Sequence, residues 1–140
     1  MEKEVIDIEK FFYIKKLYEQ KLRKLIGKNA NIGWAVFAEV LHTKTVHSQQ
    51  ELSDLVACNK AHTSRTLLKM QQNGLVKVNL TNASFALTEK GKKFAEKVIE
   101  IRNEINKKLI EDINQKDLQV FTKVFMQILA NGQTISRKEE

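Results

Sequence analysis

Apolar residues recur along most of this chain at the spacing of amphipathic helices. In residues 5–26 they fall three or four positions apart, with lysine and glutamate between them, which is the pattern of a helix that buries one face. Gly27 predicts the end of this helix, because glycine takes the left-handed capping conformation at little cost. A second helix is predicted after Asn31, whose side chain can cap it. Its apolar face comprises Trp34, Phe37, Val40 and Leu41.

Two further helices are predicted in the middle of the chain. Residues 48–51, Ser-Gln-Gln-Glu, have the form of a capping box, in which the hydroxyl accepts from a backbone N–H three residues on and the carboxylate reaches back. The helix that follows should run through Ala57 and bury Leu52 and Val56. Asn59 restarts the helical pattern, which continues to about residue 73 and is closed by a glycine at residue 74. Its inward residues are Thr63, Leu67 and Met70.

A short hairpin and two more helices complete the pattern. Strand-like runs at 75–80 and 84–87 flank residues 81–83, which predict the hairpin tip. Thr88 can cap the next helix, predicted from residue 89 to about residue 113. About 25 residues at about 1.5 Å each span roughly 37 Å, so we expect this helix to project beyond one small domain and to need a partner. Its apolar positions are Phe94, Val98, Ile101, Ile105 and Leu109.

The C-terminal part is predicted to hold one more helix. Residues 114–117 interrupt the apolar pattern, and the final helix should end before Gly132. Residues 133–140 are polar, and we expect a frayed tail there. The apolar positions of the final helix are Leu118, Phe121, Val124, Phe125, Ile128 and Leu129.

Charge indicates the class of partner. The chain has 140 residues, a formal net charge of +7 and a pI near 9.5, which favour a polyanionic partner without separating DNA from RNA or an anionic membrane. No run approaches the roughly 18 apolar residues of a membrane helix, and residues 1–10 lack the apolar core of a signal peptide. One cysteine, Cys58, cannot form an internal disulfide. We therefore expect a soluble, cytoplasmic protein.

The elements between residues 48 and 91 have the order of a winged helix-turn-helix: a capped helix, a tight turn, a second helix and a hairpin. From Leu55 to Thr88 there is no acidic residue, although four lysines and arginines lie there. In this motif polar residues of the second helix reach the major groove. The candidate DNA-binding residues are Ser48, Gln49, Asn59, Lys60, Ala61, His62, Ser64, Arg65, Lys69, Lys77, Asn79 and Asn82.

These candidates have different expected roles. Arg65 is the best candidate for a base edge or an important phosphate, because its fork can bind guanine or phosphate with two hydrogen bonds. Lys60 and Lys69 are expected to contact phosphates, which position a protein without reading sequence. The alternative is that these side chains merely solvate a helix face.

Several short motifs follow one another through the chain. They are Glu51-Leu52-Ser53, Val56-Ala57-Cys58-Asn59, Thr63-Ser64-Arg65, Gly74-Leu75-Val76 and Leu87-Thr88-Glu89-Lys90-Gly91, followed by a break at Asn114-Gln115-Lys116-Asp117-Leu118. In order and spacing they resemble the MarR family of bacterial transcription regulators, over nearly the whole chain.

The resemblance implies a mainly α, α+β fold that forms a homodimer and reads a pseudo-palindromic operator, commonly as a repressor. Residues 1–30 and 93–132 would form the helical dimerisation region, 31–92 the winged helix-turn-helix and 133–140 the polar tail of one intertwined domain. The dimerisation residues would include Ile8, Phe11, Leu118, Phe121, Phe125 and Ile128. A small-molecule effector would bind between the dimer helices and the reading domain, with Phe11, Tyr18, Trp34 and Phe37 as candidate lining residues. An aromatic stripe of this kind is also common in a protein core.

Other residues point to no further chemistry. Cys58 lies in the turn of the motif and is expected to be a small buried hydrophobe rather than a redox sensor. His42 and His47 lie near a loop, but their spacing matches no metal site, and we predict no metal or cofactor. No phosphate loop or nucleophile motif appears, so we do not expect an enzyme. Two alternatives to a specific regulator remain: a winged-helix module that binds protein, and a protein that binds nucleic acid without specificity.

The wing departs from the family's pattern, and this generates a testable expectation. The family's wing usually contains an Asp-x-Arg element whose arginine enters the minor groove, but residues 76–86 contain neither residue type. Specificity should therefore depend mainly on the second helix. We expect Arg65→Ala to abolish discrimination between operator and unrelated DNA, and Asn82→Ala to change affinity only slightly, in gel-shift titrations of both DNAs. Equal effects of the two substitutions would contradict this.

Overall fold

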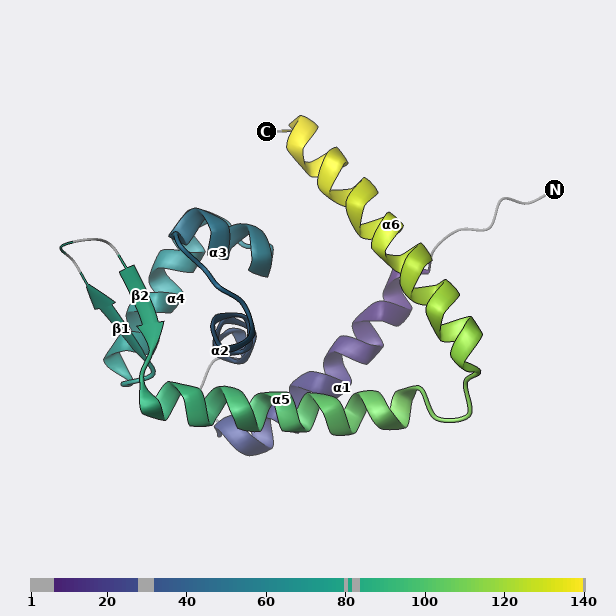
Figure 1. The fold of residues 1–140 in the computed structure, drawn as a ribbon, viewed down its shortest axis with the longest axis horizontal. Coiled ribbons are helices and arrows are strands. Elements are labelled where there is room, and N and C mark those ends of the chain that lie inside the picture. The colour runs from purple at the N-terminus through teal and green to yellow at the C-terminus, as the bar shows by residue number, and fades with distance from the viewer. Residues whose placement is uncertain (1–6, 28–31, 80, 82–83, 140) are drawn as a thin grey trace. The chain divides into compact units, whose positions relative to one another are not determined.

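The computed structural model describes residues 7–27, 32–79, 81 and 84–139, and Figure 1 shows its ribbon. Two compact units comprise residues 1–104 and 105–140. The elements are α1 (Ile8–Ile26), α2 (Gly33–Thr43), α3 (Gln49–Val56), α4 (Lys60–Gln72), β1 (Val76–Asn79), β2 (Ser84–Leu87), α5 (Glu89–Leu109) and α6 (Gln115–Glu139). The chain is therefore mostly helical with one two-stranded antiparallel sheet, as predicted.

Local capping interactions begin α3 and α4. The Ser48 hydroxyl accepts from the Glu51 N–H (3.1 Å), as the capping box predicts. The Glu51 carboxylate, however, accepts from the N–H of His47 (3.0 Å) rather than from that of Ser48. The side chain of Asn59 caps α4 by accepting from the His62 N–H (2.8 Å). Both helix starts thus follow from side chains adjacent in sequence.

A tight turn joins α3 to α4. Ala57 adopts the left-handed conformation (φ 55°) at the C-cap of α3, and the Cys58 N–H donates to the Ser53 carbonyl (3.0 Å). The hydroxyls of Ser53 and Thr63 then form a buried hydrogen bond of 2.8 Å between the two helices. Because a buried hydroxyl without a partner is costly, this bond fixes how α4 lies against α3.

Two apolar clusters hold the first unit together. One is built around Phe37, Leu52, Leu67 and Met70, so α2, α3 and α4 share it, and Val76 of β1 joins them. The other joins α1, α2 and α5, and its buried residues are Leu22, Ala35 and Val98. The inward positions predicted for α4 are confirmed, and Thr66 is buried beside them.

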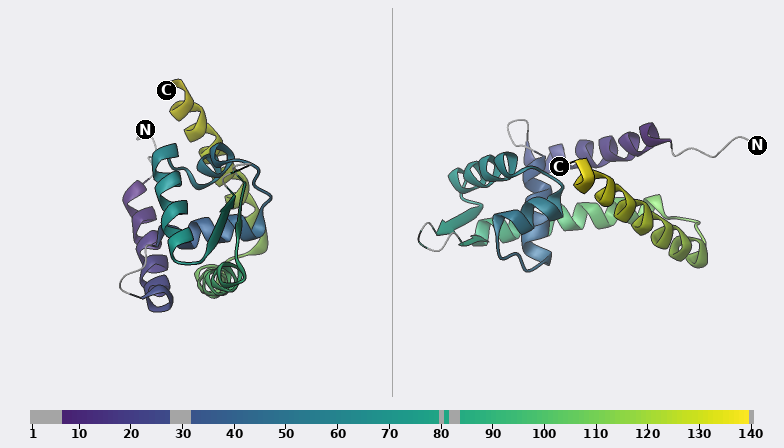
Figure 2. Two further views of the ribbon diagram at one scale, coloured as in Figure 1. Left: turned by 90° about the vertical axis from the view of Figure 1, so that its left-hand side faces the viewer. Right: turned by 90° about the horizontal axis from the view of Figure 1, so that it is seen from above.

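The wing hairpin is anchored at its base to the start of α5. Val76 pairs with Leu87 and Asn79 with Ser84 in the antiparallel register. The Thr88 hydroxyl donates to the Gly74 carbonyl (2.5 Å) and accepts from the Gly91 N–H (3.0 Å). Figure 2 shows β2 leading directly into α5. The predicted cap at Thr88 therefore also holds the end of α4 against the start of α5.

Several predicted boundaries are wrong. The helix after Thr88 ends at Leu109, not near residue 113, and Asp112 lies in the left-handed region (φ 63°). The final helix starts at Gln115, because the Asn114 side chain accepts from the N–H two residues on (2.8 Å). Residues 115–117 are thus helical rather than a break.

The final helix also runs through Gly132 to Glu139, so residues 133–139 are not a frayed tail. One glycine inside a helix costs only about 1 kcal/mol. Arg137 and Lys138 in the last turn favour the helix through its dipole.

Some predictions fall outside the described residues. They are the start of the first helix at residue 5, the cap at Asn31, and the hairpin positions Leu80, Asn82 and Ala83. The side chain of Ile8 lies outside them too. In α2, which begins at Gly33, Ile32 occupies the capping position and makes no side-chain cap.

The close approach at Gly91 generates a stability prediction. A Cβ atom there would overlap the carbonyl oxygen of Leu75 and press on the Leu87 side chain. Overpacking of this kind costs about 1–3 kcal/mol. We expect Gly91→Ala to lower the melting temperature by at least about 4 °C in thermal unfolding followed by circular dichroism. The exposed Lys93 of the same helix supplies the control, since Lys93→Ala creates no overlap and should leave the melting temperature nearly unchanged; a Gly91→Ala protein as stable as that control would show that this contact can relax.

Candidate nucleic-acid interface

Helix α4 presents one face to the core and the other to solvent. Thr63, Thr66, Leu67 and Met70 are buried, which leaves the opposite face open. The exposed residues of that face include Lys60, Ala61, Ser64, Arg65, Leu68 and Lys69. Of the candidate DNA-binding residues, the structure thus brings Lys60, Ala61, Ser64, Arg65 and Lys69 onto one surface. Leu68 was not among them, although counting around the helix from its inward residues would have found it.

Some side chains in the first turn of α4 make contacts that stabilise the fold. The Asn59 side chain is held as the helix cap. His62 is half-buried, and its ring packs edge-on against the buried Phe37 with centroids 6.4 Å apart. Of the predicted residues in this turn, Lys60 and Ala61 are exposed. At the start of α3, Ser48 is exposed and Gln49 is half-buried.

The exposed face of α4 carries cations that are not neutralised. Among the described residues, no ion pair joins Lys60, Arg65, Lys69 or Lys77 to an acidic side chain. The carboxylates of Asp54 and Glu89 have other partners: Asp54 accepts from the Gln50 amide (3.1 Å), and Glu89 pairs with Lys92 (3.2 Å). Cations without acidic partners on one helix face favour a positive local potential, which attracts phosphate.

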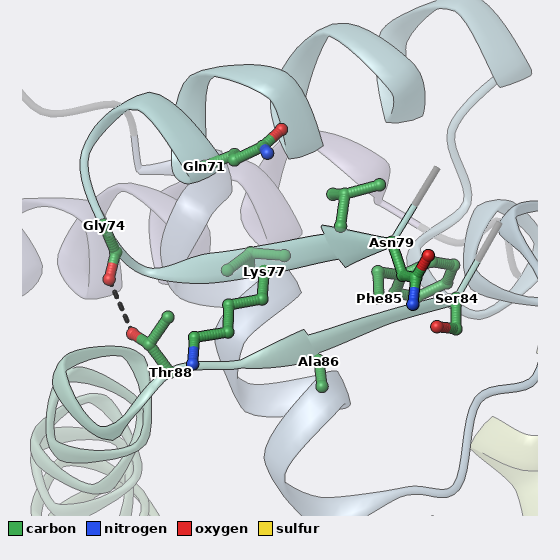
Figure 3. A pocket seen from close by; sticks show the side chains of 10 residues that line it. Gln71, Gly74, Lys77, Asn79, Ser84, Phe85, Ala86 and Thr88 are labelled. Atoms are coloured by element: carbon green, nitrogen blue, oxygen red, sulfur yellow. Dashed lines mark hydrogen bonds between the residues drawn. The ribbon is translucent and has the colours of Figure 1, made fainter. Parts of the chain in front are cut away.

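The outer side of the wing forms a shallow groove of about 780 Å³ (Figure 3). Lys77 and Asn79 are exposed there, and Gln71 lines the groove from the end of α4. The Asn79 side chain accepts from the Thr81 N–H (2.9 Å), so its oxygen is already used inside the hairpin. Lys77 is the cation that the described part of the wing contributes to this groove.

The four predicted pocket residues differ in their burial. Phe37 lies in the core at 1% exposure, and Phe11 is 42% exposed on α1. Trp34 lines a pocket of about 310 Å³, and its buried indole N–H meets no acceptor among the described residues. The other residues lining this pocket are Leu25, Ile26, Asn73, Leu75, Lys90 and Phe94.

Tyr18, the fourth predicted pocket residue, is half-buried in α1. Burial raises the pKa of its hydroxyl, and the positive charge of Arg102 opposes that rise. Arg102 of α5 forms an ion pair with Glu39 of α2, while its buried Nε has no acceptor within the described residues. These charged groups link α2 to α5 beside the aromatic side chain.

The predicted dimerisation residues of α6 form an apolar stripe. Phe121 and Phe125 stack with ring centroids 5.7 Å apart. Phe121 is 58% exposed and Ile128 37% exposed, whereas Leu118 and Phe125 are half-buried.

The remaining candidates lie in ordinary surroundings. Cys58 is half-buried and packs against the cluster around Phe37. His42 and His47 are exposed. No group of three or more histidine, cysteine, aspartate or glutamate side chains that could hold a metal ion gathers in the described part of the chain. Among the described helices, none is both long and apolar enough to cross a membrane.

Comparison with known proteins identifies the fold. No family model and no curated protein matches the chain. A MarR/EmrR family transcriptional regulator from Acinetobacter sp. ADP1 superposes with a TM-score of 0.74 at 19% identity, over 91% of this chain and 94% of that one. A MarR transcriptional regulator from Methanosarcina mazei Go1 has the same TM-score at 23% identity, again over 91% and 94%.

A third solved structure supports the same assignment. The MarR family regulator from Silicibacter pomeroyi is 22% identical, with a TM-score of 0.69 over 85% of this chain and 84% of that one. These similarities confirm, at the level of the fold, the resemblance carried by the sequence motifs. The chain has the winged helix-turn-helix fold of MarR family transcriptional regulators.

Proposed function

We propose that this protein is a sequence-specific, double-stranded-DNA-binding transcriptional regulator that acts as a homodimer. The observation that carries the proposal is the exposed face of α4, where Lys60, Arg65 and Lys69 have no acidic partner among the described residues. Three solved structures with this fold are those of transcriptional regulators, which supports the proposal by analogy of fold.

The expected contacts divide by chemistry. Lys60 and Lys69 flank the exposed face and would neutralise phosphates, as would Lys77 on the wing. Arg65 lies closer to the middle of that face, where its fork can read the O6 and N7 acceptors of guanine. The hydroxyl of Ser64 would add a contact that suits any base edge or a phosphate.

The dimer is proposed from exposed apolar surface. On α1, Phe11, Phe12, Tyr13 and Ile14 are exposed, and on α6 so are Phe121 and Val124. Exposed apolar side chains that gather along one helix in this way suit an interface. A two-fold dimer would place its reading helices about 34 Å apart, one turn of DNA, and would match a pseudo-palindromic operator.

Repression and release by an effector complete the proposal. Occupying a promoter would exclude the transcription machinery. An effector in the pocket beside Trp34 would contact α1, α2, α5 and the end of α4 at once. It could therefore shift the population between dimers that fit the operator and dimers that do not.

Selection of bound fragments from the source genome tests DNA reading. We expect one enriched pseudo-palindrome, with a log–log slope of affinity against salt of roughly −5 to −9 for about 6–10 contacted phosphates. Lys69→Ala should weaken binding to all sequences and reduce the slope by about one per half-site. Lys97→Ala, an exposed lysine of α5, is the matched control and should change neither. Steeply salt-dependent binding with no enriched sequence would favour the non-specific alternative, and little dependence of binding on salt would favour the protein-binding one.

Sizing with light scattering tests the dimer. The wild-type protein should elute as a dimer at micromolar concentration, at twice its chain mass of 16.2 kDa. Phe121→Glu places a charge in the apolar stripe of α6, which would have to be buried without a partner, and should give a monomer. Gln119→Glu introduces the same charge on the other side of that helix and should leave the dimer intact. A wild-type monomer, or a Phe121→Glu dimer, would refute this interface.

A further inference from the structure

We propose that Leu68 is a specificity-determining residue that reads the C5-methyl group of thymine in the major groove. The inference rests on the proposed function, since it requires that α4 reads DNA. Leu68 is apolar, so it was not among the polar side chains expected to contact bases.

Leu68 lies at the centre of the exposed face of α4. Successive residues of an α-helix are about 100° apart, so the four buried residues of α4 define one side of the helix. Leu68 and Ala61, seven positions apart, both lie opposite that side, and Leu68 is 54% exposed. By this count Leu68 lies about 30° from the direction opposite the core, with Arg65 about as far from it on the other side.

The surroundings of Leu68 are polar and cationic. Ser64 and Arg65 precede it by one turn, and Lys69 is its neighbour. No acidic residue occurs between Leu55 and Thr88. A single exposed leucine on a protein surface is ordinary, but this one lies near the middle of a face whose cations have no acidic partner within the described part of the chain.

The charge of this face selects the partner. An apolar side chain at its centre could meet either a protein or a base edge, but acid-free cationic flanks are complementary to a polyanion. In the major groove of DNA, the C5-methyl group of thymine is the apolar feature that a side chain can reach. Leu68 would cover this methyl while the flanking lysines hold the phosphates.

The helix geometry predicts where the thymine lies. From Arg65 to Leu68 the helix rises about 4.5 Å, and successive bases along one strand are about 3.4 Å apart. The thymine should therefore lie within about two base pairs of the guanine read by Arg65, once in each half-site.

Replacement of thymine by deoxyuridine removes only the methyl group and tests the contact. In the operator obtained by fragment selection, each symmetric pair of thymines is replaced in turn, and Kd is measured by fluorescence anisotropy. For wild-type protein we expect one pair to weaken binding by about fourfold per half-site, the effect of burying one methyl group. For Leu68→Ala, binding to the thymine operator should weaken similarly, and the deoxyuridine change should then have no further effect.

Two controls separate this contact from general effects. Lys69→Ala should weaken binding to both operators equally and keep the full effect of deoxyuridine. Because Leu68 is exposed, Leu68→Ala should melt at the wild-type temperature, which excludes misfolding as the cause. Leu68→Met, which keeps apolar reach, should retain most of the discrimination.

The outcomes distinguish this inference from the proposed function. Two outcomes would overturn the role of Leu68 while leaving DNA reading in place. In the first, an operator is enriched but no deoxyuridine replacement changes its Kd; in the second, the effect of deoxyuridine persists in Leu68→Ala. If no operator is enriched and Leu68→Ala instead abolishes binding of a protein partner, both the inference and the proposed function are wrong.

Discussion

The buried hydrogen bond between Ser53 and Thr63 is the constraint on which the placement of α4 and of its exposed face depends. It joins α3 to α4 across a turn in which Ala57 takes the left-handed conformation. Each hydroxyl also lies within hydrogen-bond distance of a carbonyl of its own helix. With that polar pair satisfied, Leu52, Leu67 and their neighbours can close around it without an unpaired buried group. The direction in which α4 presents its outer face follows from this junction.

The outer face of α4 contributes little to holding the fold together. Isolated surface charges add little stability even when paired, and these cations are unpaired within the described residues. The inner face carries the packing, the N-cap and the link to α3. This separation lets outer residues vary while the scaffold stays unchanged. The same fold can therefore serve chains that are only about a fifth identical in sequence.

Local interactions made much of the fold predictable. The caps at Ser48, Asn59 and Thr88 each act on a backbone N–H three residues on, so sequence adjacency suffices to find them. The predicted helix boundaries between residues 109 and 117 were wrong because apolar periodicity does not reveal what sets them. These features are the hydrogen bond to the Asn114 side chain and the left-handed backbone conformation of Asp112. The start of α2 lacked a side-chain cap among the described residues, so nothing local marked it.

The sequence by itself determined the order of the helices and wing, the inward side of α4 and the acid-free cationic segment, because these depend on residue type and short spacing. Only the tertiary structure decided that Phe37 is buried in the core, that His62 packs against it, and that Trp34 lines a pocket. Those outcomes depend on which elements are in contact, and these contacts are determined by packing between side chains far apart in sequence. The central position of Leu68 lies between the two cases: helical spacing implies it, but the burial of its neighbours reveals it.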